Sequence, residues 1–136
     1  MLDSCLLFAL ACWQPLPARV PLRELAADRL KIGAAVEPAL LGEQEYAAKL
    51  AREFSQLEPE NAMKFERVHP GPATYNFEPA DSLVPFSQSH RMAVRGHTLV
   101  WHQQLPSWVT SGGYSFVGLS SILADHIYTV VKHFAG

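Results

Sequence analysis

The sequence predicts an α/β fold in which outer helices cover a parallel sheet. Three short segments of strand length alternate with stretches whose apolar residues recur every three or four positions. The order is strand, helix, strand, helix, strand, helix, and no hairpin turn signal separates two strands. Strands that alternate with helices in this way are joined by crossovers and lie parallel in one sheet.

The first unit begins with a short helix around Leu22, Leu25 and Ala26. The first strand is expected at residues 30–36, an apolar run that ends before Pro38. Residues 43–54 then form an amphipathic helix. Its apolar face consists of Tyr46, Ala47, Leu50 and Phe54.

The second unit begins with a strand at residues 57–60, which runs into a polar loop. A long surface connection is marked by Pro70-Gly71-Pro72. A helix is expected from Pro79 to Ser87, and Pro85 should kink or shorten it.

The third unit has a strand at residues 92–100 and the clearest helix of the chain at 122–134. Doubly wound sheets and eight-fold barrels both begin with such units, but three units do not close a barrel, which takes about 250 residues. The chain of 136 residues stops where a fourth strand should start, so we expect an incomplete sheet. Ile32, Ala34, Met92 and Val94 are expected on its inner face, without the opposing layers of a closed barrel.

Composition excludes several classes of protein. The net charge is −2 and no run of Lys or Arg occurs, which argues against a nucleic-acid partner or a polybasic membrane-surface protein. No stretch approaches the roughly 18 apolar residues of a membrane-spanning helix. Residues 36–39 follow the first strand without the glycine-rich turn of a dinucleotide site. We therefore expect no cofactor and no membrane partner.

Residues 1–18 are expected to be a signal-like leader ahead of one domain at residues 19–136. The run from Cys5 to Trp13 is apolar, and Ala9-Leu10-Ala11 before Cys12 resembles a cleavage site. A positive flank is missing, because Asp3 is the only charged residue before Arg19. The expectation is a secreted or periplasmic protein, and the alternative is a poorly ordered extension. The two cysteines form neither a disulfide framework nor a zinc pattern.

Polar side chains follow the second and third predicted strands. Because the carboxyl ends of parallel strands meet at one edge, these side chains should face the same mouth. Amide, carboxylate, ammonium and imidazole groups together with an indole suit a sugar, whose hydroxyls need donors and acceptors and whose ring packs on an aromatic face. The residues are Glu60, Asn61, Lys64, Arg95, His97, Trp101 and His102.

Each of these signals has a simpler interpretation. Glu60 and Lys64 are four apart and could form an exposed helical ion pair. Trp101 could be a packing residue. His97 and His102 could bind zinc, but no third ligand stands at a familiar spacing, so we expect no metal site.

Two further histidines, His126 and His133, fall on the last predicted helix, where we expect partly exposed structural residues.

Three blocks of sequence carry a family resemblance. Residues 32–36 (IGAAV), 58–65 (EPENAMKF) and 94–109 (VRGHTLVWHQQLPSWV) resemble family 10 of the glycoside hydrolases, the endo-1,4-β-xylanases. The spacers agree at 75–77, 80–81, 126–127 and 129–131. The resemblance runs from about Leu22 to Gly136. Phe65 stands where the family usually has Trp, an aromatic exchange that keeps the packing.

The resemblance implies the first three βα units of a TIM (β/α)8 barrel that cleaves internal β-1,4 bonds of xylan with retention. Glu60, Asn61 and Lys64 would bind sugars on the non-reducing side of the cut. His97 would hydrogen-bond the sugar next to the bond, and Trp101 would wall that subsite. Retaining chemistry needs two carboxyl groups about 5–5.5 Å apart.

Both family glutamates, the acid/base and the nucleophile, fall beyond Gly136, so no catalytic residue is assigned within this chain. The implied partners are xylan and xylo-oligosaccharides, and the full-length protein should be a monomer. Three hypotheses about the chain remain. It is the N-terminal piece of a xylanase and inactive by itself, a non-catalytic xylan-binding protein, or the inactive product of a truncated gene.

Overall fold

The computed structural model describes residues 19–135, so the predicted leader at 1–18 lies outside the described residues. The strands are β1 (Gly33–Val36), β2 (Gln56–Pro59) and β3 (Ala93–Val94). The α-helices are α1 (Leu22–Ala26), α2 (Gln44–Glu53), α3 (Phe65–Val68), α4 (Glu78–Asp81), α5 (Leu83–Ser89), α6 (Ser107–Thr110) and α7 (Phe116–Phe134). Two 3-10 helices, η1 (Ala27–Arg29) and η2 (Pro38–Gly42), flank β1.

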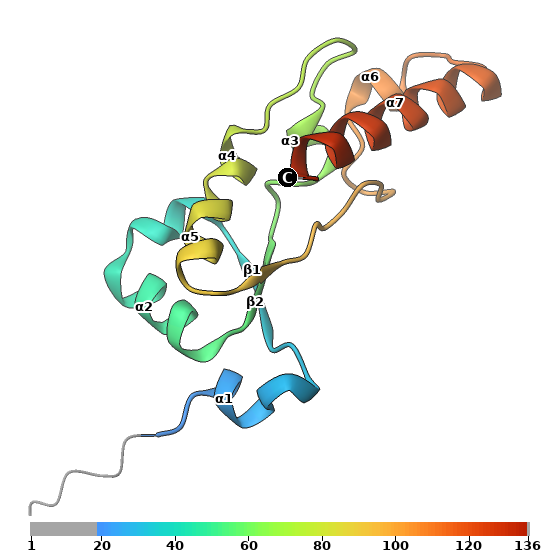
Figure 1. Ribbon diagram of the computed structural model, residues 1–136. Helices are drawn as coiled ribbons and strands as arrows, with labels where there is room; N and C mark the ends of the chain where they lie inside the picture. Colours follow the sequence, from blue (N-terminus) through green and yellow to red (C-terminus); the bar gives the residue numbers. More distant parts are fainter. Residues whose placement is uncertain (1–18, 136) are drawn as a thin grey trace, which may run out of the picture.

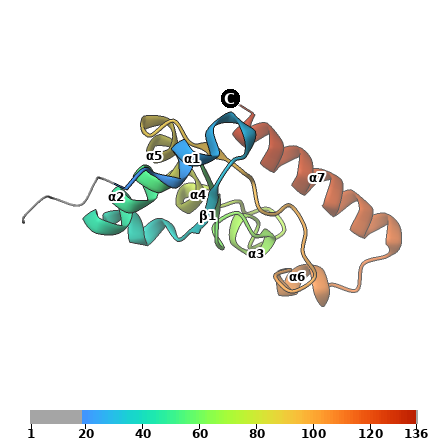
Figure 2. The same ribbon diagram turned by 90° about the horizontal axis from the view of Figure 1, so that it is seen from below.

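The three strands form one parallel sheet in the order β1-β2-β3, as predicted from the alternation of strands and helices. Gly33 pairs with Gln56, and Gln56 with Ala93. The sheet is open, and the chain leaves it toward α3, α6 and α7 (Figure 1). Helices α2 and α5 lie on one side of the sheet, and α7 lies on the far side of the molecule from α2 (Figure 2).

The main core fills the space between the sheet and helices α2 and α5. It is built from Val36, Leu57, Leu50, Leu83 and Met92. Side chains alternate along a strand, so Ala34, which packs against this core, shares the face of Val36.

Ala34 and Met92 are expected on the inner face of the sheet, but both side chains pack on the opposite face, toward the helices, so this expectation is wrong. It is also wrong for Val94, which pairs with the core residue Leu57 and so lies on the same face. The opposite face carries exposed Ala35 and an ion pair between Arg95 and Glu58 at 2.9 Å.

Strand β3 is much shorter than the predicted run at 92–100. The amide of Ala93 donates to the carbonyl of Ser55, directly before β2, and the amide of Arg95, directly after β3, donates to the carbonyl of Leu57 on β2. The next rung of this parallel ladder would need an N–H at position 59, and Pro59 has none. Pairing therefore ends, and residues 95–106 continue without strand structure.

Strand β1 also begins later than predicted, at Gly33. The carbonyl of Ile32 accepts from the amides of both Ser55 and Gln56, so regular pairing starts one residue further along.

The helix expected from Pro79 to Ser87 is divided at Ser82 into α4 and α5. Pro85 is the third residue of α5, where a backbone N–H has no partner within the helix, so proline is tolerated. The expected helix is therefore interrupted, but at Ser82 and not at Pro85, and α5 continues through Pro85 to Ser89.

Helix α7 starts six residues earlier than predicted. The hydroxyl of Ser115 caps it by accepting from the amide of Gly118 at 3.2 Å. His126 is 1% exposed, so the expectation of partial exposure is wrong for this residue. It faces α3, where its ring stacks on Phe65. His133 is partly exposed as expected and contacts Asp81.

None of the helices in the described part of the chain has the length and apolar character needed to cross a bilayer.

Candidate sugar-binding site

The candidate site starts where β2 ends. The amide of Glu60 donates to the carbonyl of Val36, which ties the chain after β2 to the end of β1. The amide of Lys64 donates back to the carbonyl of Asn61, so these residues form a turn that leads into α3. Residues 60–64 are not helical, and Glu60 is exposed whereas Lys64 is 5% exposed. The alternative of an exposed helical ion pair is therefore wrong.

Lys64 and Trp101 meet at the centre of the site. The Lys64 ammonium lies 4.5 Å from the centroid of the Trp101 ring, a cation–π contact. Trp101 is 37% exposed, so it is not a core residue. Among the side chains that the structure describes, no carboxylate lies at ion-pair distance from the Lys64 ammonium. The pair thus combines a cation with an aromatic surface open to solvent.

Gln104 connects the two segments of the site. Its Nε2 donates to Asn61 Oδ1 at 3.3 Å and lies 3.5 Å from Glu66 Oε1. Its backbone amide donates to the carbonyl of Trp101, and its carbonyl accepts from the amide of Glu66. The side-chain Oε1 is buried and has no hydrogen-bond partner among the described residues.

Sequence reasoning did not assign Gln104 a role. The sequence indicates only that Gln104 lies three residues after Trp101 in the third block. The segment is irregular, so no periodicity shows that the Gln104 side chain packs against Asn61.

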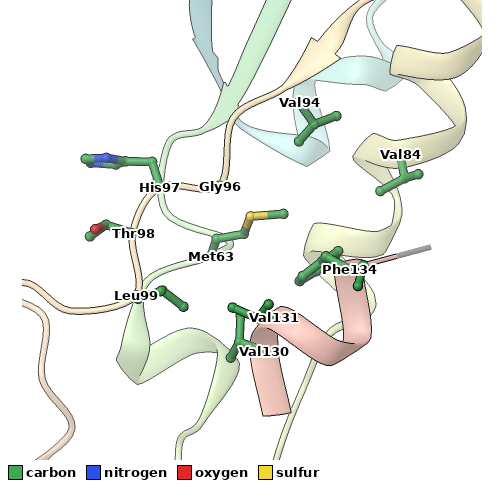
Figure 3. Close-up of a pocket in the computed structure, with 11 residues that line it drawn as sticks. Met63, Val84, Val94, Gly96, His97, Thr98, Leu99, Val130, Val131 and Phe134 are labelled. Atoms are coloured by element: carbon green, nitrogen blue, oxygen red, sulfur yellow. The ribbon is translucent and has the colours of Figure 1, made fainter. Parts of the chain in front are cut away.

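His97 lies on the segment that follows β3. Its imidazole and the Thr98 side chain point to one side of the backbone, whereas Leu99 points to the other (Figure 3). On the Leu99 side lies a cavity of about 470 Å³ between this segment and the end of α7. Its walls are largely apolar, including Met63, Val130 and Phe134, and His97 and Thr98 also border it. No hydrogen bond joins His97 to Lys64 or Asn61 in the described residues.

The other candidates lie around this centre. Burial raises the pKa of Tyr46, and the nearby Glu60 carboxylate raises it further, which places Glu60 toward α2. Arg95 is occupied by its ion pair with Glu58. His102 is exposed and meets the Trp101 ring edge-on.

A group of stacked, buried aromatic rings lies next to Lys64, between α3 and α7. Phe65, next to Lys64, stacks on His126 with ring centroids 3.7 Å apart, and His69 stacks on Tyr75 at 4.0 Å. Phe65 is 3% exposed, so it fills its place as the aromatic exchange predicts. Burial lowers the pKa of His69 and, most strongly, lowers that of His126 to about 4. Both rings are therefore neutral near pH 7.

The site offers donors and acceptors of several chemical kinds. In the part of the chain that is described, no three His, Cys, Asp or Glu side chains are grouped to hold an ion. Lys64 offers an ammonium, Asn61 an amide, and Trp101 a flat ring against which a pyranose can pack.

Comparison with known proteins places this geometry in a family. The model of glycosyl hydrolase family 10 matches residues 21–136. The chain is 42% identical to endo-1,4-β-xylanase B of Thermotoga neapolitana over 99% of this chain and 40% of that protein. It is 44% identical to a β-1,4-xylanase of Dictyoglomus thermophilum over 85% of this chain and 32% of that protein.

Solved structures agree with the sequence relatives. The crystal structure of xylanase 10B from Thermotoga petrophila in complex with xylobiose has a TM-score of 0.76 at 44% identity, covering 85% of this chain and 37% of that one. The chain thus spans about two fifths or less of the relatives it matches. Its open parallel sheet with outer helices is part of a (β/α)8 barrel. With a family match across nearly all the described residues, the chain belongs to glycosyl hydrolase family 10.

Proposed function

We propose that this chain supplies the glycone-side sugar-binding surface of an endo-1,4-β-xylanase. Lys64 and Asn61 bind hydroxyls of the xylan chain on the non-reducing side of the cut, together with Glu60. His97 hydrogen-bonds the sugar next to the cleaved bond, and Trp101 forms a wall of that subsite.

The observation that carries the proposal is the contact between Lys64 and Trp101. The Lys64 side chain is 5% exposed and has no carboxylate partner among the described side chains, so its ammonium donors can serve the hydroxyls of a ligand. The exposed Trp101 ring beside it supplies the apolar surface against which a sugar ring packs. Neutral, polyhydroxylated ligands match this combination, and several relatives are named xylanases.

The test is binding of xylotriose to the full chain, measured by calorimetry. Lys64→Met should weaken binding by about ten- to a hundredfold, because a hydrogen bond from a charged donor contributes about 1.5–3 kcal/mol. Trp101→Ala should weaken it by removing the stacking surface.

Lys132→Met is the matched control, since Lys132 also lies over an aromatic ring, that of Tyr128 at 5.7 Å, but on exposed α7. The control should bind as the parent does. Equal affinities of the parent, Lys64→Met and Trp101→Ala chains for xylotriose would refute the assignment.

A further inference from the structure

His126 contacts both segments that carry the sugar-binding side chains. Its Nε2 lies 2.9 Å from the carbonyl oxygen of Leu99, which stands between His97 and Trp101 in the chain. Its ring lies flat on Phe65, with centroids 3.7 Å apart and planes 7° apart, and Phe65 directly follows Lys64. One buried side chain on α7 thus joins the segment after β3 to the segment after β2.

The hydrogen bond to Leu99 fixes the tautomer of His126. A carbonyl oxygen only accepts, so Nε2 must carry the hydrogen. Nδ1 is buried and has no partner in the described residues, which suits the unprotonated nitrogen of a neutral ring. Neighbouring groups are His69, stacked parallel at 5.5 Å, and Asp125 on α7 itself. Burial outweighs the attraction of the Asp125 carboxylate and keeps the pKa of His126 low.

We propose that His126 is a positioning residue that holds the segment 97–101 over Lys64. The inference rests on the proposed function, since it concerns the same sugar site. All three residues border the cavity beside α7, but the Leu99 side chain points toward α7, whereas the His97 and Thr98 side chains point to the other side of the backbone (Figure 3). Anchoring the Leu99 carbonyl from the α7 side therefore sets which side chains the segment presents outward. The 4.5 Å contact of Trp101 with Lys64 depends on that anchor.

Two substitutions separate the hydrogen bond from the packing. His126→Gln keeps an N–H donor in the place of Nε2 and loses the flat ring. His126→Phe keeps a flat ring on Phe65 and loses the donor. If His126 positions the segment through its hydrogen bond, Gln preserves sugar binding better than Phe, whereas a residue that only fills the core gives the reverse order.

The experiment measures three quantities on the full chain: the affinity for xylotriose, the NMR resonance of the Trp101 indole N–H, and the midpoint of thermal unfolding. His126→Phe should weaken xylotriose about tenfold, equivalent to about 1.4 kcal/mol, and should move the Trp101 resonance. His126→Gln should stay within about threefold of the parent with the Trp101 resonance in place, even if its unfolding midpoint falls.

His133→Phe is the matched control on the same helix. His133 also stacks on a phenylalanine, Phe77 at 3.8 Å, and also contacts an oxygen, Asp81 Oδ1 at 2.6 Å, but it does not touch the segment after β3. Its substitution should change neither xylotriose affinity nor the Trp101 resonance.

The outcomes distinguish the two proposals. If the parent chain does not bind xylotriose, the proposed function is wrong, and the Trp101 resonance in the two variants still decides whether His126 positions the segment. If the parent binds and His126→Phe binds equally well with an unmoved Trp101 resonance, the positioning role is wrong. A nitrogen NMR spectrum of the parent provides a check without substitution: an Nδ1–H tautomer of His126 at pH 7 would also overturn the inference.

Discussion

Lowering the pH from 7 toward 4 is expected to destabilise the folded chain through His126. The ring is 1% exposed, and burial lowers its pKa from 6.5 to about 4. The hydrogen bond to the Leu99 carbonyl and the Asp125 carboxylate act in the opposite direction, and His69 adds to the lowering. In the unfolded chain the same imidazole titrates near its ordinary value.

The sign follows from the proton balance. Between about pH 6.5 and pH 4 the unfolded chain binds a proton at this position and the folded chain does not, so acid favours unfolding. The stability that depends on neutral His126 is fully present above pH 6.5 and is lost as the pH falls to about 4. The shift corresponds to about 3 kcal/mol in total, at 1.36 kcal/mol for each pKa unit. For a domain of ordinary stability this is a large fraction of the free energy of unfolding.

Urea unfolding followed by circular dichroism at several pH values between about 7 and 4.5 measures this loss. The phenylalanine in His126→Phe cannot take up the proton. The free energy of unfolding of this variant should therefore fall less steeply with decreasing pH than that of the parent, and the difference in slope should correspond to about one bound proton. The remaining slope includes His69, whose pKa is also lowered by burial. Parallel pH profiles for the parent and His126→Phe would refute the assignment of this dependence to His126.

Two further predictions concern stability and activity. Arg23→Met should lower the free energy of unfolding by about 2–3 kcal/mol. The Arg23 guanidinium donates to the carbonyls of Ala51, His90 and Arg91 at 2.9–3.0 Å, and these bonds connect α1 to the ends of α2 and α5. An unchanged midpoint of urea unfolding would show that water replaces these bonds. The 136-residue chain alone should release no reducing sugar from xylan, since the family's two catalytic glutamates are expected beyond Gly136; turnover by the purified chain at the rate of an intact xylanase would contradict this.

The features that could be predicted from the sequence are those that depend on local periodicity. Helix α2 turns Tyr46 and Leu50, four residues apart, toward the core, α7 buries His126 and Val130, also four apart, and β1 is a short apolar run, so the type of these elements follows from the pattern. The sugar-binding candidates Asn61, Lys64 and Trp101 were found because they follow strands whose carboxyl ends meet at one edge.

The features that could not be predicted depend on partners distant in sequence. The sequence of a short strand such as β3 does not show which of its faces meets helices, so it does not predict the side on which Val94 lies. The burial of His126 depends on Phe65, and no pattern on α7 reveals that contact. Gln104 joins the site because an irregular segment folds back on Asn61, which has no periodic signature.

Pro59 affects the conformation of the segment that carries the candidate residues His97 and Trp101. Had β3 run on to residue 100 as predicted, alternate side chains of residues 95–100 would have been held on opposite faces of a pleated strand. Because position 59 of β2 has no amide hydrogen, the hydrogen bonds between β2 and the third strand end at Arg95. The freed backbone bends far enough to present His97 and Thr98 on one side and Leu99 on the other, and to return Trp101 to Lys64. A residue of the sheet thereby sets where the segment that carries His97 and Trp101 begins.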